Sequence, residues 1–171
     1  MRRVALGLGA NLGDRVAALQ GAVDLLAPLL LDARVSSVYE TAPVGGPADQ
    51  PDYANAVLVG STDLDPHALL DAAPAAEEAW HRVRQVRWGP RTLDVDVLRI
   101  GDLELHDERL ELPHPRAAER AFVLVPWAEV EPDAELVGRG AVVELAAAAV
   151  ADAGPDAVRR RDDVALEVRG L

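Results

Sequence analysis

Two aspartates separated by one residue, Asp94 and Asp96, are the residues of this sequence best suited to chemistry. They lie in the stretch LDVDVLRI at 93–100, which predicts a β-strand. Side chains alternate between the faces of a strand, so both carboxylates would project from one face, with their α-carbons roughly 6.5–7 Å apart. Carboxylates that close repel each other unless a cation lies between them, and Mg²⁺ prefers carboxylate and phosphate oxygens. The pair therefore predicts a magnesium site, and a solvated strand face is the alternative.

The segment directly upstream of this strand carries four arginines: Arg82, Arg84, Arg87 and Arg91. Guanidinium groups match the geometry of phosphate oxygens, and neutralisation of charge is the main requirement of phosphoryl transfer. Cations that lead into paired carboxylates predict a site for a polyphosphate and its metal. The alternative is a basic loop that pairs with nearby acids. Trp88, in the stiff turn at 88–90, would either stack on a base or pack against its neighbours.

Two further clusters contain groups that could bind a ligand. In RLELPHPRAAERAF at 109–122, prolines flank His114, and three arginines and Phe122 lie nearby. A lone histidine is more often structural, but one held rigidly among arginines could donate to a phosphate. In YETAPVGGPADQPDYANA at 39–56, Thr41, Tyr53 and Asn55 supply hydroxyl, aromatic and amide groups. Asn55 could pair with a heterocycle through its donor–acceptor edge, and a polar turn with a packed tyrosine is the alternative.

The composition narrows the chemistry. All 17 basic residues are arginine and cysteine is absent, which excludes a Walker A lysine, a Schiff base and thiolate catalysis. Phosphate must then be held by arginine, backbone amides or metal. The formal net charge of −12 predicts that the chain binds neither nucleic acid nor an anionic membrane. Its apolar runs are too short for a membrane span or a signal-peptide core, so we expect a cytoplasmic protein.

The elements that would position these residues follow the order β-α-β-β-α-β. The alternation of apolar residues predicts strands at 3–9, 33–44, 53–62 and 93–100. Helices are predicted from Asp14 and from Asp65 to Trp80, the second with Pro74 in its interior. This order is typical of an α+β fold, the ferredoxin-like βαββαβ sandwich.

The remaining residues predict a C-terminal extension of the same domain, which we expect to span 1–171. A hairpin is predicted at 101–112, helices at 122–130 and 141–152, and a last strand at 164–170. The segment GLGANLG at 7–13 has two glycines of a dinucleotide-binding loop, but Leu12 occupies the position of the third. It predicts a glycine-rich turn into the first helix.

Four of these segments resemble one protein family. RWGPRTLDVDVL at 87–98 closely resembles the signature of 6-hydroxymethyl-7,8-dihydropterin pyrophosphokinase, the diphosphokinase of folate biosynthesis. The segments GANLGD at 9–14, YETAPVGGPADQPDYANAV at 39–57 and LPHPRAAERAFVLVPW at 112–127 resemble the same family in the same order. The resemblance covers about 3–135 and agrees with the predicted ferredoxin-like order of elements.

The resemblance implies a role for each cluster. Asp94 and Asp96 would bind two Mg²⁺ ions, and together with Arg82 and Arg91 they would form the catalytic group. The residues implied to bind ATP are Glu77, Arg82, Arg84, Trp88, Arg91, Arg109, His114 and Arg120. The pterin would lie between Tyr53 and Phe122. Its hydrogen-bonding edge would be read by Asn55 and by the backbone at Thr41, Ala42 and Val44.

The implied reaction is attack by the pterin hydroxyl on the β-phosphorus of ATP, with AMP as the leaving group. Two positions depart from the family pattern: Pro74 stands where a polar residue near adenine is common, and His81 replaces a small residue. Two other functions fit parts of the sequence. One is a non-catalytic ferredoxin-like module that binds a nucleotide or a pterin, and the other is a metal-dependent phosphohydrolase. We expect a monomer.

Overall fold

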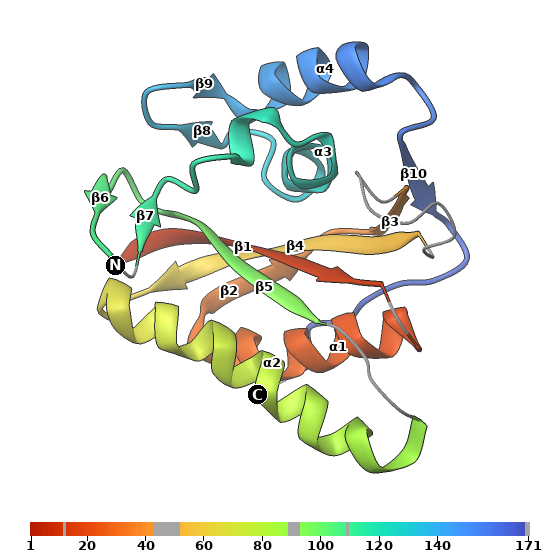
Figure 1. Cartoon of the computed structure of the whole chain (residues 1–171). Helices are drawn as coiled ribbons and strands as arrows, with labels where there is room; N and C mark the ends of the chain where they lie inside the picture. Colours follow the sequence, from red (N-terminus) through yellow and green to blue (C-terminus); the bar gives the residue numbers. More distant parts are fainter. Residues whose placement is uncertain (12, 43–51, 89–92, 109, 170–171) are drawn as a thin grey trace.

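The computed structural model describes residues 1–11, 13–42, 52–88, 93–108 and 110–169, and for 82–88 the backbone alone. The described residues form a mixed fold with an antiparallel sheet and four α-helices (Figure 1). The helices are α1 (Arg15–Leu26), α2 (Pro66–Trp88), α3 (Ala121–Val130) and α4 (Val142–Ala153), with short 3₁₀ helices η1 (Ala27–Leu29) and η2 (Ala117–Glu119). The main sheet contains β1 (Arg2–Ala10), β2 (Leu31–Val35), β3 (Val38–Thr41), β4 (Tyr53–Thr62), β5 (Asp94–Ile100) and β10 (Val158–Arg161).

The strands of the main sheet follow the order β10-β3-β4-β1-β5, and β2 also pairs with β4. All of these pairings are antiparallel. Two small hairpins lie outside the sheet: β6 (Leu105–His106) with β7 (Glu111–Leu112), and β8 (Glu135–Leu136) with β9 (Gly140–Ala141). Up to β5 the elements follow the predicted order β-α-β-β-α-β, with the second predicted strand divided into β2 and β3.

Helices cover both faces of the sheet. In Figure 1, α1 and α2 lie along one face, and α3 with α4 lies over the other. Val4, Leu6 and Leu8 of β1 point into the core shared with α1 and α2, whereas Ala5 points into the core that contains Leu124 and Trp127 of α3. Alternation along the strand therefore divides the apolar residues between two cores.

Several predicted boundaries are confirmed, and three features differ. Strand β4 begins and ends as predicted, and α3 and α4 agree within one residue. The predicted strand at 33–44 is divided at Ser36, whose hydroxyl accepts a hydrogen bond from Val57 N of β4 (2.9 Å). This contact interrupts the regular pairing with β4, so that β2 ends before Ser36 and β3 begins after it. Helix α2 continues to Trp88, beyond the predicted end at Trp80.

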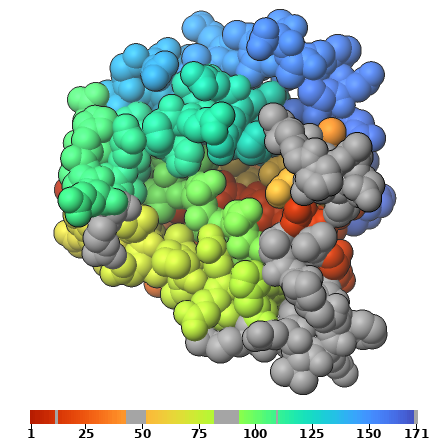
Figure 2. Space-filling view, viewed as in Figure 1, coloured from red at the N-terminus to blue at the C-terminus, as the bar shows by residue number. Residues whose placement is uncertain are grey.

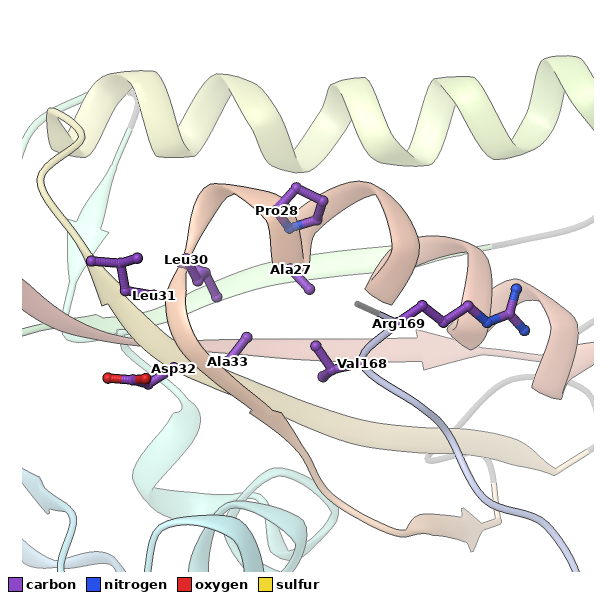
Figure 3. A pocket seen from close by; sticks show the side chains of 8 residues that line it. All are labelled: Ala27, Pro28, Leu30, Leu31, Asp32, Ala33, Val168 and Arg169. Atoms are coloured by element: carbon purple, nitrogen blue, oxygen red, sulfur yellow. The ribbon is translucent and has the colours of Figure 1, made fainter. Parts of the chain in front are cut away.

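The third difference concerns the C-terminal tail. The predicted strand at 164–170 is wrong for residues 164–169, which form no strand, and β10 at 158–161 pairs with β3 instead. The tail packs beside α1, where the Gln20 side chain exchanges two hydrogen bonds with the backbone of Glu167 (2.8 and 2.9 Å). Beyond it, Val168 and Arg169 cover a cavity of about 110 Å³ beside η1 and β2 (Figure 3). Apolar side chains dominate this cavity, so we assign it no chemistry.

Helix α3 is attached to the sheet by a buried charged group. The two carboxylate oxygens of Glu131, the residue after α3, accept hydrogen bonds from Arg3 of β1 (2.6 and 3.0 Å) and from Arg99 of β5 (2.7 Å). The Arg99 guanidinium also lies 5.4 Å from the centre of the Trp127 ring. These contacts connect the end of α3 with the two strands that carry Gly7, Gly9, Asp94 and Asp96.

Gly21 of α1 packs directly against the Trp80 ring of α2. A β-carbon at this position would lie 2.7 Å from Cε3 and 2.9 Å from Cζ3 of Trp80, whose ring is buried. Helix α2 contains Pro74 in its interior. Within the described residues, no helix has the length and apolar character needed to cross a membrane. Glycine at 21 therefore permits the packing that places α2 beside β5.

We expect Gly21→Ala to lower the free energy of unfolding by about 1–3 kcal/mol, because the added methyl group must displace the Trp80 ring. The better helix propensity of alanine offsets at most ~1 kcal/mol of this loss. Urea unfolding followed by circular dichroism measures the effect. In a Trp80→Leu background the penalty should shrink, and an equal penalty in both backgrounds would contradict the explanation.

Candidate active site

A cavity of about 750 Å³ lies on the α3 side of the sheet. Its walls come from β1, β3, β4 and β5, from the segment 116–123 and from the residues between α4 and β10. Figure 2 shows a recess beneath α3, with atoms of β1, in red, exposed at its base. The predicted site residues that line this cavity are Thr41, Ala42, Tyr53, Asn55, Asp94, Asp96, Arg120 and Phe122.

The floor of the cavity is made of glycine. Gly9 of β1 is paired with Asn55 on one side and Asp94 on the other, and Gly7 is paired with Asp96. A β-carbon on Gly9 would lie 3.3 Å from the Asn55 side-chain oxygen. Both glycines lie within β1, as the predicted strand at 3–9 has them, whereas the predicted turn at 7–13 begins too early. Their lack of side chains leaves open space between the aspartates and Asn55.

Asp94 and Asp96 project together from β5, as the alternation predicted. Both side chains are exposed, whereas Val95 and Val97 between and beyond them are buried. Partial burial and the charge of Asp96 raise the pKa of Asp94, and a weaker effect of His81 opposes them. Within the part of the chain that the structure describes, no group of three or more His, Cys, Asp or Glu side chains comes together that could hold a metal ion. Asp94 and Asp96 alone offer two carboxylates on one face of β5. This fits Mg²⁺, which commonly keeps waters and takes one or two carboxylates plus substrate phosphates.

Glu77 of α2 supports the strand that carries the aspartates. Its Oε1 accepts a hydrogen bond of 2.7 Å from the backbone N–H of Val95, the residue between Asp94 and Asp96. Burial raises the pKa of Glu77; the Val95 hydrogen bond opposes this, and the charges of the two aspartates reinforce it. In the structure Glu77 therefore contacts the backbone of β5, and its predicted role in binding ATP stays a prediction.

His114 and Arg120 lie on the α3 side of the aspartates. Burial lowers the pKa of His114, with the charge of Asp96 opposing this and that of Arg120 adding to it. The Arg116 backbone N–H donates to His114 Nδ1 (3.2 Å), so the ring must be neutral with its proton on Nε2. The Arg120 guanidinium lies 5.5 Å from the centre of the Phe122 ring. The Nε2–H group and the guanidinium are both donors that suit an anionic oxygen.

The opposite part of the cavity is suited to a flat polar heterocycle. Asn55 is 5% exposed, and its amide nitrogen donates to the Thr41 hydroxyl (2.9 Å). This contact fixes the orientation of the amide, which leaves its oxygen as the acceptor and its second N–H as a donor. Tyr53 from β4 and Phe122 from α3 contribute aromatic walls. The structure thus brings Thr41, Tyr53 and Asn55, from the predicted cluster at 39–56, together with Phe122 from the cluster at 109–122.

Some predicted residues cannot be placed. Arg82, Arg84 and Trp88 lie in the last turns of α2, where the backbone alone is described. Val44, Arg91 and Arg109 lie outside the described residues. Their roles remain predictions.

The sequence analysis missed other residues that line the cavity. Glu119 comes from the segment that precedes α3, and Ala153, Ala157 and Val158 come from the C-terminal part of the chain. Arg116, one of the three arginines noted near His114, lines the cavity as well. The alternation GLG within an apolar strand was a usable signal for the glycine floor. We find no local signal in the sequence for the C-terminal wall, because β10 is placed by pairing with β3.

The chain is similar in sequence to one family of known proteins. The family model of 7,8-dihydro-6-hydroxymethylpterin-pyrophosphokinase (HPPK) matches residues 5–132. A protein of Methylorubrum extorquens strain AM1 named 2-amino-4-hydroxy-6-hydroxymethyldihydropteridine pyrophosphokinase is 44% identical over 162 residues, which cover 94% of this chain and 99% of that protein. A protein of the same name from Pseudomonas aeruginosa is 43% identical over 150 residues, covering 86% of this chain and 92% of that protein.

Solved structures show the same fold. The wild-type HPPK-DHPS of Plasmodium falciparum with pteroate aligns with a TM-score of 0.73 at 14% identity, over 93% of this chain and 47% of that chain. Another HPPK-DHPS structure, in complex with substrates, aligns with a TM-score of 0.70 at 12% identity, over 89% of this chain and 44% of that chain. The chain thus spans less than half the length of these solved chains. On the family match and the identity to its relatives, the chain belongs to the 7,8-dihydro-6-hydroxymethylpterin-pyrophosphokinase family.

Proposed function

We propose that this chain transfers the pyrophosphoryl group of ATP to the hydroxyl of 6-hydroxymethyl-7,8-dihydropterin and releases AMP, as a transferase of folate biosynthesis. The observation that carries the proposal is the arrangement across the glycine floor. A carboxylate pair lies on one side of Gly7 and Gly9, and the Asn55–Thr41 pair lies on the other. Family membership supports the same reaction.

The carboxylate side would accept the triphosphate and its metal. Asp94 and Asp96 would hold Mg²⁺, and we expect two ions. Bound Mg²⁺ would neutralise phosphate charge and polarise the reacting oxygens. Arg120 and the Nε2–H of His114 would donate to phosphate oxygens, with Arg82 and Arg91 as the further catalytic cations. Arg84, Arg109 and Trp88 would complete the nucleotide site, and Glu77 would keep β5 in place behind the aspartates.

The amide side would bind the pterin. Asn55 offers an acceptor and a donor side by side, which matches the edge of a pterin ring, and the backbone at Ala42 and Val44 would add to this reading. Tyr53 and Phe122 would stack on the ring from the sheet and from α3. The attacking hydroxyl would then face the phosphates across Gly7 and Gly9, which carry no side chains themselves.

We draw three further inferences about the chain as a whole. The antiparallel order β5-β1-β4-β3, with α1 and α2 on one face, is consistent with a ferredoxin-like core to which α3, α4 and β10 are added. Because β10 completes the sheet, we infer that residues 1–171 act as one domain. We also infer that the chain acts as a monomer.

The direct test is AMP formation from ATP and Mg²⁺ by the purified full chain, with and without 6-hydroxymethyl-7,8-dihydropterin. We expect AMP and the pterin diphosphate in equal amounts, and little AMP without the pterin. Omission of Mg²⁺ with EDTA present should abolish the reaction. Absence of AMP with an authentic pterin, or release of phosphate without any acceptor, would contradict the proposal.

The glycine floor allows a sharper prediction. A methyl group at position 9 would point into the space between Asp94 and Asn55, 3.3 Å from the Asn55 oxygen. We expect Gly9→Ala to raise KM for the pterin about 10-fold or more, because the methyl group occupies space needed by the ring, and ~1.4 kcal/mol of lost binding corresponds to a factor of ten. Steady-state kinetics with each substrate varied in turn gives the result. Gly21→Ala, which acts on the packing of α1 against α2, controls for a general loss of stability. An unchanged pterin KM in Gly9→Ala would contradict the assignment of the floor.

A further inference from the structure

Glu40 of β3 is the centre of a charged cluster behind the candidate pterin site. Its Oε1 accepts hydrogen bonds from Arg15 Nη2 and from Arg161 Nη1, both at 2.7 Å. Arg15 is the first residue of α1, and Arg161 is the last residue of β10. The three side chains are between 18% and 28% exposed. The contact joins three elements through one shielded carboxylate.

The electrostatics show that Glu40 is paired as an ion. Burial on its own would raise the pKa of Glu40, but hydrogen bonds from Arg161 and Arg15, together with their charges, lower it below its ordinary value. The carboxylate is thus charged at neutral pH, and its hydrogen bonds are of the stronger, charge-assisted kind.

The same cluster holds the residue that precedes β4. Arg15 Nη1 donates to the backbone carbonyl of Asp52 (2.7 Å), and Arg159 Nη2 donates to Asp52 Oδ2 (2.6 Å). Tyr53, the next residue, begins β4 and lines the cavity. Arg15 therefore bridges the Glu40 side chain and the start of the strand that carries Tyr53 and Asn55.

The register of the sheet connects this cluster with the cavity. Thr41 is paired with Tyr53 of β4 on one side and with Val158 of β10 on the other. All three residues line the cavity, whereas Glu40, next to Thr41, points to the opposite face, toward α1. The cluster thus lies directly behind the row of residues that would surround the pterin edge.

We propose that Arg15, Glu40, Asp52, Arg159 and Arg161 form a positioning cluster that holds β3, β4 and β10 in the register needed for pterin binding. This inference rests on the proposed function and assigns a role to the C-terminal strand, which lies beyond the residues matched by the family model. The members of the cluster touch no substrate. They act through Thr41, Tyr53 and Asn55, whose relative placement depends on the three strands.

The test compares Glu40→Gln with the wild-type full chain. The amide keeps the size of the side chain but weakens both arginine contacts. We expect the Kd of the pterin to rise about 10-fold, equivalent to ~1.4 kcal/mol, when it is measured by isothermal titration calorimetry with Mg²⁺ and α,β-methylene-ATP. That analogue cannot release AMP, so binding is measured without turnover. KM for the pterin should rise by a similar factor while KM for ATP stays within about twofold.

Two controls separate positioning from general destabilisation. Asp162→Asn changes a carboxylate in the same segment whose contact with Arg160 is exposed, and it should leave the pterin Kd unchanged. Gly21→Ala should lower the melting temperature and leave the Kd of the pterin unchanged. Amide hydrogen exchange in 39–41 and 53–55 should be faster in Glu40→Gln than in Asp162→Asn.

Each outcome decides between two claims. A wild type that forms AMP, with a pterin Kd unchanged in Glu40→Gln or raised equally in Gly21→Ala, would overturn the positioning role alone. A wild type that neither binds the pterin nor forms AMP would overturn the proposed function, and the positioning role with it. A selective loss of pterin affinity in Glu40→Gln would support both.

Discussion

Asp94→Asn and Asp96→Asn are expected to reduce pterin-dependent AMP formation by about 10³-fold or more, a loss of ~4 kcal/mol in transition-state stabilisation. Each amide keeps the shape of the side chain but removes a charged oxygen ligand from the pair that would hold Mg²⁺. The rate should be measured at saturating ATP and over a range of Mg²⁺ concentrations. Partial recovery at high Mg²⁺ would indicate that weakened metal binding is the cause.

The same variants should not lose stability. The pKa of Asp94 is raised by partial burial and by the charge of Asp96, which means that the ionised pair destabilises the protein without its ligands. Removal of one charge should leave the melting temperature in EDTA unchanged or slightly higher. Asp133→Asn, an exposed aspartate after α3, serves as the matched control for activity. An Asp94→Asn variant that is folded and fully active would contradict the metal site.

Glu131→Ala should cause the largest loss of stability, about 3–5 kcal/mol in the free energy of unfolding. The substitution leaves Arg99, 8% exposed, without its carboxylate partner and also removes the contacts of Arg3 and Trp127. A buried cation without a partner is costly because it has lost its hydration. Urea unfolding measures the loss, and Glu135→Ala at an exposed position should change stability by less than ~0.5 kcal/mol.

The pH dependence provides an independent check on Glu131. Burial favours the protonated form, but hydrogen bonds from Trp127 and Arg3 and the charges of Arg99 and Arg3 lower the pKa below its ordinary value of 4.5. A lowered pKa means that the stabilisation is fully present above 4.5 and is lost as the pH falls through the folded-state value. The difference in unfolding free energy between the wild type and Glu131→Gln should therefore be constant near neutral pH and shrink in acid. A difference that grows in acid would contradict this account.

The part of the site that could be predicted from sequence depends on local geometry. Alternation within a strand is a property of the extended backbone, so the common face of Asp94 and Asp96 follows from their spacing alone. The helix starts were also local, since Asp14 accepts a hydrogen bond from Ala17 N (3.0 Å) and Asp65 accepts one from His67 N (2.9 Å). For residues whose spacing predicts no common face and no helix start, the expected roles came from the family resemblance alone.

The tertiary structure decided which of these local pieces meet. The glycines at 7 and 9 form the cavity floor only because β1 lies between β4 and β5. The partners of Glu131 and of Glu40 come from distant parts of the chain, and β10 reaches β3 by antiparallel pairing. Such pairings depend on the packing of whole elements and leave no periodic pattern in the sequence. The sequence by itself therefore determined that the two carboxylates share one face of a strand, because alternation is local. Long-range strand pairing determined the cavity that they line, because it depends on the packing of distant elements.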